Sequence, residues 1–539
     1  MRAKKFIPVA AAIAATALVL TGCSAGGATT AGGSVKDAAT KSSGTLVYAT
    51  GEPDHLTPGR QTVAFTQVMS LFEPLTYVDD KNKITYDQAK SVTSDDATNW
   101  TITIRKGWKF QDGTPVTAQT YVDAWNYTAY APNAFENSGE LAEIAGYSDL
   151  NPTSGTPATK TMSGLKVVNA TTFTVKLDHA DSQFPLQLSQ AQTGFYPMPE
   201  SAYADMAAYD KKPVGDGPYK MSQAWVANKE FTVKKWAGYA GKAPKIANVT
   251  FRSYASQDTA YTDVLAGNAD VLYLPTDKMT SAKSDFGDRL KSFDAPGIDY
   301  IAFPLGNPKY QNKKLRQAIS MSIDRSAVNK AIYGGLYTNA TALTPPAMSG
   351  TPLGICGKYC TFNPKAAKKL LAQAGGFTGE MDIVYPGGDG LDSLFQAYAN
   401  QIRQNLGITD VVAKPSTDWA SYYSTLVDGS VAGPHFGHWG ALYQSQQNTL
   451  RSLFTKAGGC YLCTSFSDPA VDTLLTKADE ASTQTAANAA YKEVQAKVLD
   501  EFPIVPTFFD KYSYVTSDRV KTLPASAGSP VVQDITLNK

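Results

Sequence analysis

Four of the five cysteines form two close pairs in the second half of the chain, Cys356 with Cys360 and Cys460 with Cys463. Thiols at such spacings can close small disulfide loops or bind zinc. Four cysteines allow three disulfide pairings, and the sequence alone does not choose among them. The spacings differ from the two matched C-x₂-C pairs of a four-thiolate zinc site, and no thioredoxin-like βαβ pattern surrounds Cys460. We therefore favour two local disulfides and keep zinc as the alternative.

Histidine offers a second route to metal chemistry, but the chain has only four, and just two of them, His435 and His438, lie close together in the stretch GPHFGHWG. The stretch has the character of a strand, in which residues three apart point to opposite faces. The two rings would then not converge on one ion. We predict no metal and no cofactor, and we expect His438 to be a hydrogen-bonding side chain in a binding cleft.

Catalytic motifs are scarce. The sequence GCSAG at residues 22–26 matches the G-x-S-x-G pattern of hydrolases. That pattern is meaningful only between a strand and a helix, and here it follows an apolar leader. The chain has no phosphate-binding loop, and no catalytic pair of carboxylates can be identified among its 48 acids. We predict that the protein is not an enzyme; an exported hydrolase is the minor alternative.

The N-terminus has the pattern of a secretory signal. Three basic residues precede the uncharged run Ile7–Leu20, which is too short to span a membrane. The sequence LTGC at residues 20–23 resembles the bacterial lipobox, in which the chain is cut before the cysteine and lipid is attached to its sulfur. We predict a signal peptide at 1–22, lipid attachment at Cys23 and a flexible tether at 23–44, which is rich in Gly, Ala, Ser and Thr. A plain signal peptide is the alternative.

Composition excludes one class of partner and suggests the size of the fold. Removal of the leader takes away three basic residues and lowers the formal net charge from +1 to −2. Without a basic excess we predict no nucleic-acid partner. The remaining chain exceeds the usual size of one hydrophobic core, so at least two lobes are expected.

The elements that must position these residues alternate between strands and helices. The stretch 45–50 is rich in β-forming residues and predicts a strand, and period-two patterns predict strands near 100–105, 173–177 and 249–251. Helices are predicted to begin after Thr117, Asn363 and Asp468, because each of these polar residues can cap the apolar stripe that follows. The predicted fold class is α/β with α+β character.

Several stretches occur in an order that is typical of one family. They are WTITIRKGWKFQDGTPVTAQTYVDAW (100–125), PVGDGPYKM (213–221), LAGNADV (265–271), LRQAISMSIDRSAVNKAIYGG (315–335), FNPKAAKKLLAQAG (362–375), FSDPAVDTLLTKA (466–478) and EFPIVPTFFDKYSYV (501–515). Together they resemble the family 5 extracellular solute-binding proteins, the peptide/nickel/opine-type receptors of ABC importers, over roughly residues 45–525. One departure is Asp216, where that family usually has Thr.

The resemblance implies a two-lobed periplasmic-binding-protein-like fold with an extra subdomain in lobe one. We expect lobe one at 45–298, the subdomain at about 78–210, lobe two at 299–508 and a return to lobe one at 509–539. Such receptors close on a ligand between their lobes and deliver it to ABC permease subunits. We expect a monomer.

A second departure concerns the ligand. Peptide-binding members carry a W-x-A-D-Y-type segment, whose aspartate pairs with the α-ammonium of the peptide. Here the segment is Trp439-Gly440-Ala441-Leu442-Tyr443, and no acidic residue lies between Asp428 and Asp468. Glu52, in the early loop ATGEPDHLTP, is a candidate substitute.

The sequence therefore predicts a lipid-anchored receptor for oligopeptides or another small oligomeric solute. It would lie on the outer face of the cell membrane or on its periplasmic side. The missing acid keeps open a ligand with an uncharged end, or an oligosaccharide that stacks on Trp439 and Tyr443. A structural surface lipoprotein without a ligand is a further alternative.

Overall fold

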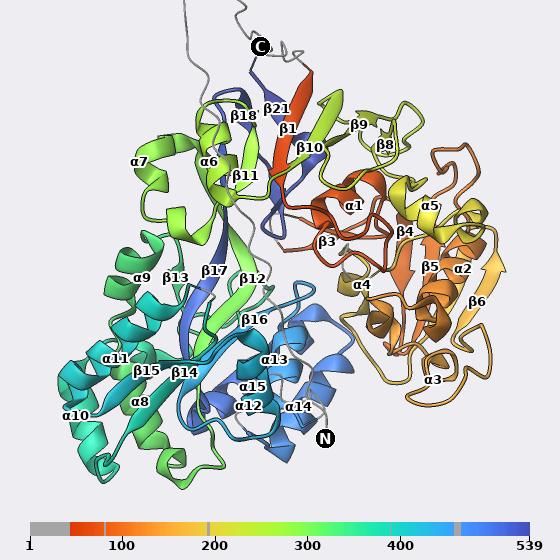
Figure 1. Cartoon of the computed structure of the whole chain (residues 1–539). Coiled ribbons are helices and arrows are strands. Elements are labelled where there is room, and N and C mark those ends of the chain that lie inside the picture. Colours follow the sequence, from red (N-terminus) through yellow and green to blue (C-terminus); the bar gives the residue numbers. More distant parts are fainter. Residues whose placement is uncertain (1–43, 80–81, 191–193, 389, 457–464, 539) are drawn as a thin grey trace, which may run out of the picture. The chain divides into compact units, whose positions relative to one another are not determined.

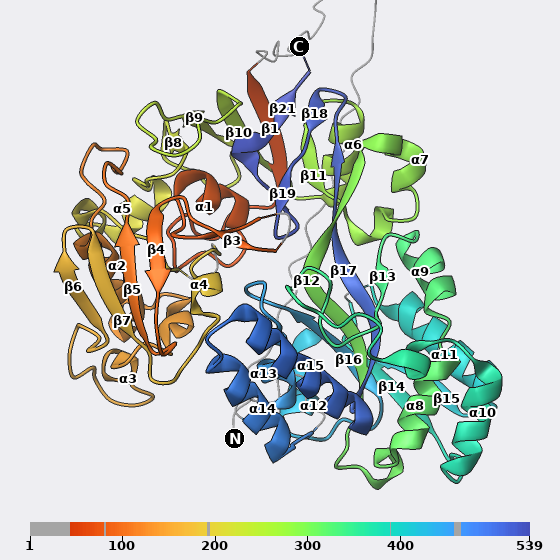
Figure 2. The same cartoon turned by 180° about the vertical axis from the view of Figure 1, so that it is seen from behind.

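The computed structural model describes residues 44–79, 82–190, 194–388, 390–456 and 465–538 (Figures 1 and 2). The predicted signal peptide, Cys23, all but the last residue of the predicted tether, and the pair Cys460 and Cys463 lie outside these ranges. Among the helices that the structure describes, none has both the length and the apolar character needed to cross a membrane.

The largest sheet in the described part of the chain has eleven strands. In spatial order these are β15 (Val411–Pro415), β14 (Met381–Tyr385), β16 (His435–Gly440), β12 (Leu290–Ala302), β17 (Ile504–Thr516), β11 (Val271–Tyr273), β1 (Thr45–Thr50), β10 (Asn248–Ser253), β9 (Phe231–Lys235) and β8 (Tyr219–Met221), with β13 (Thr338–Asn339) paired to β17. A second sheet has the order β4 (Ala89–Thr93), β5 (Asn99–Ile104), β7 (Thr172–Lys176) and β6 (Leu165–Asn169).

Two-stranded pairs complete the sheets. They are β2 (Tyr77–Val78) with β3 (Ile84–Thr85), β18 (Val520–Thr522) with β21 (Thr536–Leu537), and β19 (Ala525–Ser526) with β20 (Ser529–Pro530).

The α-helices of the described chain form two groups in the sequence, one before the long strand β12 and one between β12 and the long strand β17. Before β12 lie α1 (Phe65–Leu71), α2 (Ala118–Ala129), α3 (Tyr147–Leu150), α4 (Phe184–Gln187), α5 (Met206–Lys211), α6 (Gln257–Leu265) and α7 (Ala282–Phe286). Between β12 and β17 lie α8 (Lys313–Ser322), α9 (Arg325–Tyr333), α10 (Pro364–Gln373), α11 (Asp392–Leu406), α12 (Trp419–Val427), α13 (Gln446–Phe454), α14 (Pro469–Asp479) and α15 (Gln484–Glu501).

Two large hydrophobic cores are joined by β12 and β17, which have 13 residues each and lie side by side (Figures 1 and 2). One core contains Trp125 and Phe173 of the second sheet and its helices, and the other contains Ile319 and Tyr398 of the helices between β12 and β17. The C-terminal part of β12 (297–302) pairs with β16, and the C-terminal end of β17 (514–516) pairs with β11. Each long strand therefore contributes to both halves of the molecule.

The helix caps and the strand alternation that the sequence predicts are present in the structure. Thr117 caps α2, where its hydroxyl accepts a hydrogen bond from the Thr120 amide (3.3 Å). Asn363 and Asp468 cap α10 and α14 in the same way, each before a proline at the first helical position. In β5, Trp100 and the apolar residues at alternate positions are buried, as the period-two pattern predicts. The α/β class is confirmed.

One of the two close cysteine pairs forms a local disulfide. It joins Cys356 and Cys360, whose Cα atoms are 5.6 Å apart.

Asp216, the residue that stands where the family usually has Thr, is fully buried. Its carboxylate accepts hydrogen bonds from the Glu73 amide (3.1 Å) and from Gln88 Nε2 (2.7 Å). Burial raises the pKa of Asp216 to about 7 despite these bonds. Asp216 therefore links the backbone at Glu73 to the side chain of Gln88 inside the first half of the molecule.

Candidate ligand-binding site

Strand β16 presents its two histidines to different environments. His435 is fully buried, whereas the side chain of His438 is 42% exposed. His438 lies beside Asp299 of β12, and the last residue of the strand, Gly440, lies beside Gly297. The two imidazoles therefore do not converge, as the strand periodicity predicts.

The segment that follows β16 is held by one side chain of α13. Asn448 Oδ1 accepts hydrogen bonds from Trp439 Nε1 (3.1 Å) and from the Leu442 amide (3.3 Å). The Ala441 amide donates to the carbonyl oxygen of Pro296 in β12 (2.9 Å). The chain thus turns sharply after β16 and stays attached to the crossover strand.

This turn brings lobe-two residues against the first half of the chain. Leu442 and Tyr443 pack in a small apolar cluster with Val78, Ile84 and Leu186. The Tyr443 hydroxyl donates to Gln447 Oε1 (2.8 Å). The segment that contains Leu442 and Tyr443 therefore lies where the two halves of the molecule touch.

A polar bridge, here called the 181–479 bridge, continues this contact. Gln447 Nε2 of α13 donates to Asp181 Oδ1 (2.8 Å) and to Asp479 Oδ1 (2.9 Å), and the Ser182 amide donates to the Asp479 carbonyl (2.8 Å). Burial, followed by the negative charges of Glu143 and Asp479, holds the pKa of Asp181 well above its usual range. Two buried carboxyl groups thus share one amide donor across the contact.

Glu52 lies in a different setting from the β16 turn. Its Oε1 accepts hydrogen bonds from Trp225 Nε1 (3.0 Å) and from the Asn228 amide (3.0 Å). These contacts are within the first half of the chain. The carboxylate has therefore a structural role there, whether or not it also meets a ligand.

A cluster that sequence reasoning missed surrounds His438. One oxygen of Asp299, one oxygen of Asp510 and a ring nitrogen of His438 lie within 4.8 Å of one another. His438 Nε2 is 2.9 Å from Asp510 Oδ2. Burial alone would lower the pKa of His438, but the attraction of Asp510 and then Asp299 outweighs it and raises the pKa to about 9. We call these three residues the crossover cluster.

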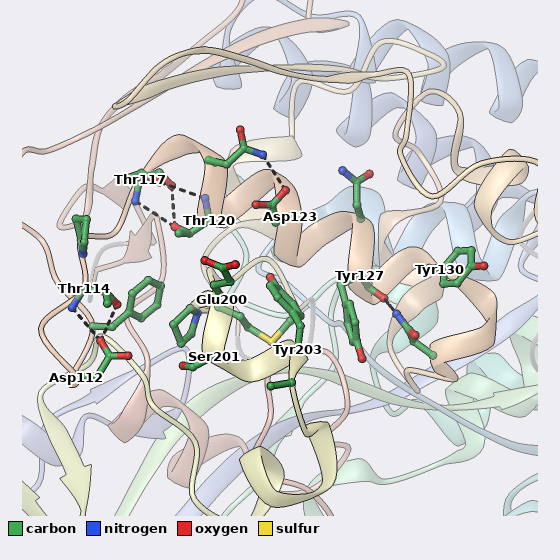
Figure 3. Close-up of a pocket in the computed structure, with 18 of the residues that line it drawn as sticks. Asp112, Thr114, Thr117, Thr120, Asp123, Tyr127, Tyr130, Glu200, Ser201 and Tyr203 are labelled. Atoms are coloured by element: carbon green, nitrogen blue, oxygen red, sulfur yellow. Dashed lines mark hydrogen bonds between the residues drawn. The ribbon is translucent and has the colours of Figure 1, made fainter.

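A cavity of about 1090 Å³ lies elsewhere, along one face of α2 (Figure 3). Two of its labelled acids serve local structure, since Asp112 accepts from the Thr114 amide (2.9 Å) and Asp123 accepts from Gln119 (2.7 Å). None of the predicted ligand-binding residues lines it. We therefore do not take this cavity as the candidate site.

Two α/β halves joined by a pair of long crossover strands, with a polar and aromatic contact between them, define a two-lobed solute-binding protein. The model of the bacterial extracellular solute-binding proteins, family 5 (middle region), matches residues 83–460. The chain belongs to this family, as the ordered motifs predicted.

Individual relatives support the same assignment. The oligopeptide-binding protein OppA of Bacillus subtilis is 25% identical, with 94% of each chain covered. The probable deoxycholate-binding periplasmic protein YgiS of Escherichia coli is 24% identical, with 85% of this chain and 86% of the relative covered. Among solved structures, the unliganded open form of the periplasmic murein tripeptide-binding protein MppA has a TM-score of 0.81 at 24% identity and covers 92% of this chain and 97% of that one. The two-lobed fold is thereby confirmed.

Proposed function

We propose that the protein is the lipid-anchored receptor of an ABC importer, and that it captures oligopeptides between its lobes for delivery to the permease. The observation that carries this proposal is the contact of the Trp439–Tyr443 segment with Val78 and Leu186 of the other lobe. A ligand held between those surfaces would be buried by lobe closure, which supplies affinity by excluding water. The role is binding and delivery, not catalysis.

The proposed site consists of residues from both lobes. It includes Glu52, His438, Trp439, Gly440, Ala441, Leu442 and Tyr443. The proposed lobes run over 45–298 and 299–508, with the subdomain at about 78–210 and the return at 509–539. Names of relatives favour peptide, since OppA is an oligopeptide-binding protein and MppA a murein peptide-binding protein.

A non-peptide ligand is the second candidate. Leu442 is apolar and packs against lobe one, so the position offers no charge to an ammonium group. One relative is named for deoxycholate, which lacks such a group. An oligosaccharide or another solute without a cationic end would fit a site that relied on Trp439 and Tyr443 alone.

The test is to identify the cargo. The protein is purified from cells grown in rich medium, weighed intact by native mass spectrometry, and then denatured to release what it carries. A set of peptide masses supports the proposal. A series of masses spaced by one hexose, or a mass typical of a sterol, would show that the ligand is not a peptide. A protein that carries nothing, and whose melting temperature neither peptides nor non-peptide solutes raise, would overturn the proposed function.

A further inference from the structure

The crossover cluster projects from one face of the large sheet. Asp299 of β12 lies between His438 of β16 and Phe508 of β17, and Asp510 is two residues along from Phe508. Directly paired residues, and residues two apart on a strand, share a face. The side chains of three different strands are therefore brought together at one point.

That point lies where the two cores meet. Along the same face of β17, Phe508 belongs to the second core and Tyr514 to the first. Asp510 stands between them. His438 is 42% exposed on its side chain, so the cluster can be reached from solvent.

The Asp510 carboxylate of the cluster is incompletely satisfied. Asp510 is only 8% exposed, and among the described residues its Oδ1 has no hydrogen-bond partner, although Oδ2 meets His438. Burial and the charge of Asp510 raise the pKa of Asp299 to about 7, so above that pH two carboxylates face one imidazolium and the cluster has a net negative charge. A shielded oxygen without a donor is costly and marks a place where a partner is missing.

Aromatic rings lie close to these acids. Tyr333 and Tyr337 stack with their centroids 4.1 Å apart, and Tyr333 packs against Phe508. Burial and then the charge of Asp510 raise the pKa of Tyr337, and the same two causes raise that of Tyr512 to about 12. Carboxylate oxygens beside phenol rings suit a primary ammonium, which has three N–H donors and is attracted to aromatic faces.

A transition metal fits less well. Such an ion needs the lone pair of a neutral imidazole. Here His438 Nε2 is already in a charge-assisted hydrogen bond with Asp510, which keeps the ring protonated at neutral pH.

We propose that Asp299, His438 and Asp510 form the site that binds a primary ammonium group of the ligand, in place of the acid that is absent at Leu442. The two positions follow one another along the same strands, because His438 pairs with Asp299, Gly440 pairs with Gly297, and the Ala441 amide bonds to Pro296 of β12. This inference rests on the proposed function, since it assigns one end of the captured peptide.

The test uses a pool of tripeptides in which each sequence is present both with a free amino terminus and N-acetylated. Half of the sequences contain lysine, which separates the terminal ammonium from a side-chain ammonium. The purified protein is incubated with the pool, separated from unbound peptide and analysed by mass spectrometry. The variants are Asp510→Asn, Asp299→Asn and, as the matched control, Asp294→Asn, because Asp294 lies on the same strand but pairs with Lys511.

Wild type and Asp294→Asn should retain ammonium-bearing peptides about tenfold or more over peptides without one, as expected for a charge-assisted hydrogen bond. Asp510→Asn and Asp299→Asn, checked for folding by circular dichroism, should lose that preference while still retaining peptides. Equal retention of both forms by wild type, or a preference that persists in both variants, would overturn the inference and leave the proposed function standing. So would a bound metal ion that EDTA and Asp510→Asn both remove. Capture of no peptide at all overturns the proposed function and this inference with it.

Discussion

We expect Asp299 to destabilise the ligand-free protein at neutral and higher pH. Burial and then the charge of Asp510 raise its pKa from 3.8 to about 7, although His438 acts in the opposite direction. In the unfolded chain Asp299 ionises near pH 4, so its folded-state penalty grows as the pH rises from about 4 to 7 and is complete above 7. Asp299→Asn should therefore stabilise the protein by about 1–2 kcal/mol at pH 8 and hardly at all at pH 4, measured by thermal unfolding. An equal gain at both pH values would contradict this.

Gly297 makes room for the neighbouring carboxylate. A Cβ atom at this position would overlap the carboxylate of Asp510. We expect Gly297→Ala to cost about 1–3 kcal/mol of stability and to abolish the preference for ammonium-bearing peptides. Gly306→Ala is the control, because its Cβ would meet no atom within 4 Å. Unchanged peptide preference in Gly297→Ala would argue against the placement of Asp510.

At the scale of elements, α13 connects the two lobes through Gln447. Gln447→Glu replaces the shared donor by a third carboxyl group in the 181–479 bridge, where burial already disfavours charge. We expect a loss of about 2–3 kcal/mol and a larger radius of gyration of the ligand-free protein in small-angle X-ray scattering. Gln446→Glu is the matched control, since Gln446 bonds to Ser349 and Gln495 in lobe two. The Gln446→Glu variant should lose stability while its radius of gyration stays unchanged. A larger radius of gyration in both variants would show that the effect does not come from the 181–479 bridge.

The sequence predicted the elements that depend on neighbouring residues, but not the contacts that depend on the order of the strands. Thr117, Asn363 and Asp468 act on the next turn of chain, so their capping roles were readable from neighbouring residues. The β16 turn was found through its family motif. The crossover cluster unites residues 299, 438 and 510, whose proximity depends on strand order and on a bulge in β12. No local pattern encodes that register, so the sequence offered Glu52 as the candidate replacement acid and gave no sign of the cluster.

At the scale of the whole molecule, the proposed anchor makes a prediction about location. Cys23→Ser removes the sulfur that would carry lipid, and with it the acyl chains, each worth about 0.8 kcal/mol per buried methylene. We expect this variant to move from the membrane fraction to the soluble exported fraction, assayed by immunoblotting, while Ser24→Ala stays with the membrane. If the Cys23→Ser variant lost its leader, as shown by its intact mass, and still remained in the membrane fraction, attachment would have to come from another part of the chain.

The crossover strands also set the order in which the protein can be completed. Tyr514, Leu523, Val532 and Ile535 belong to the core that begins with Leu46, so the first lobe to emerge during synthesis lacks part of its interior until the last residues arrive. A growing chain therefore cannot finish its first half ahead of its second. For an exported protein that delay is useful, because a chain that has not yet folded can still be threaded across a membrane.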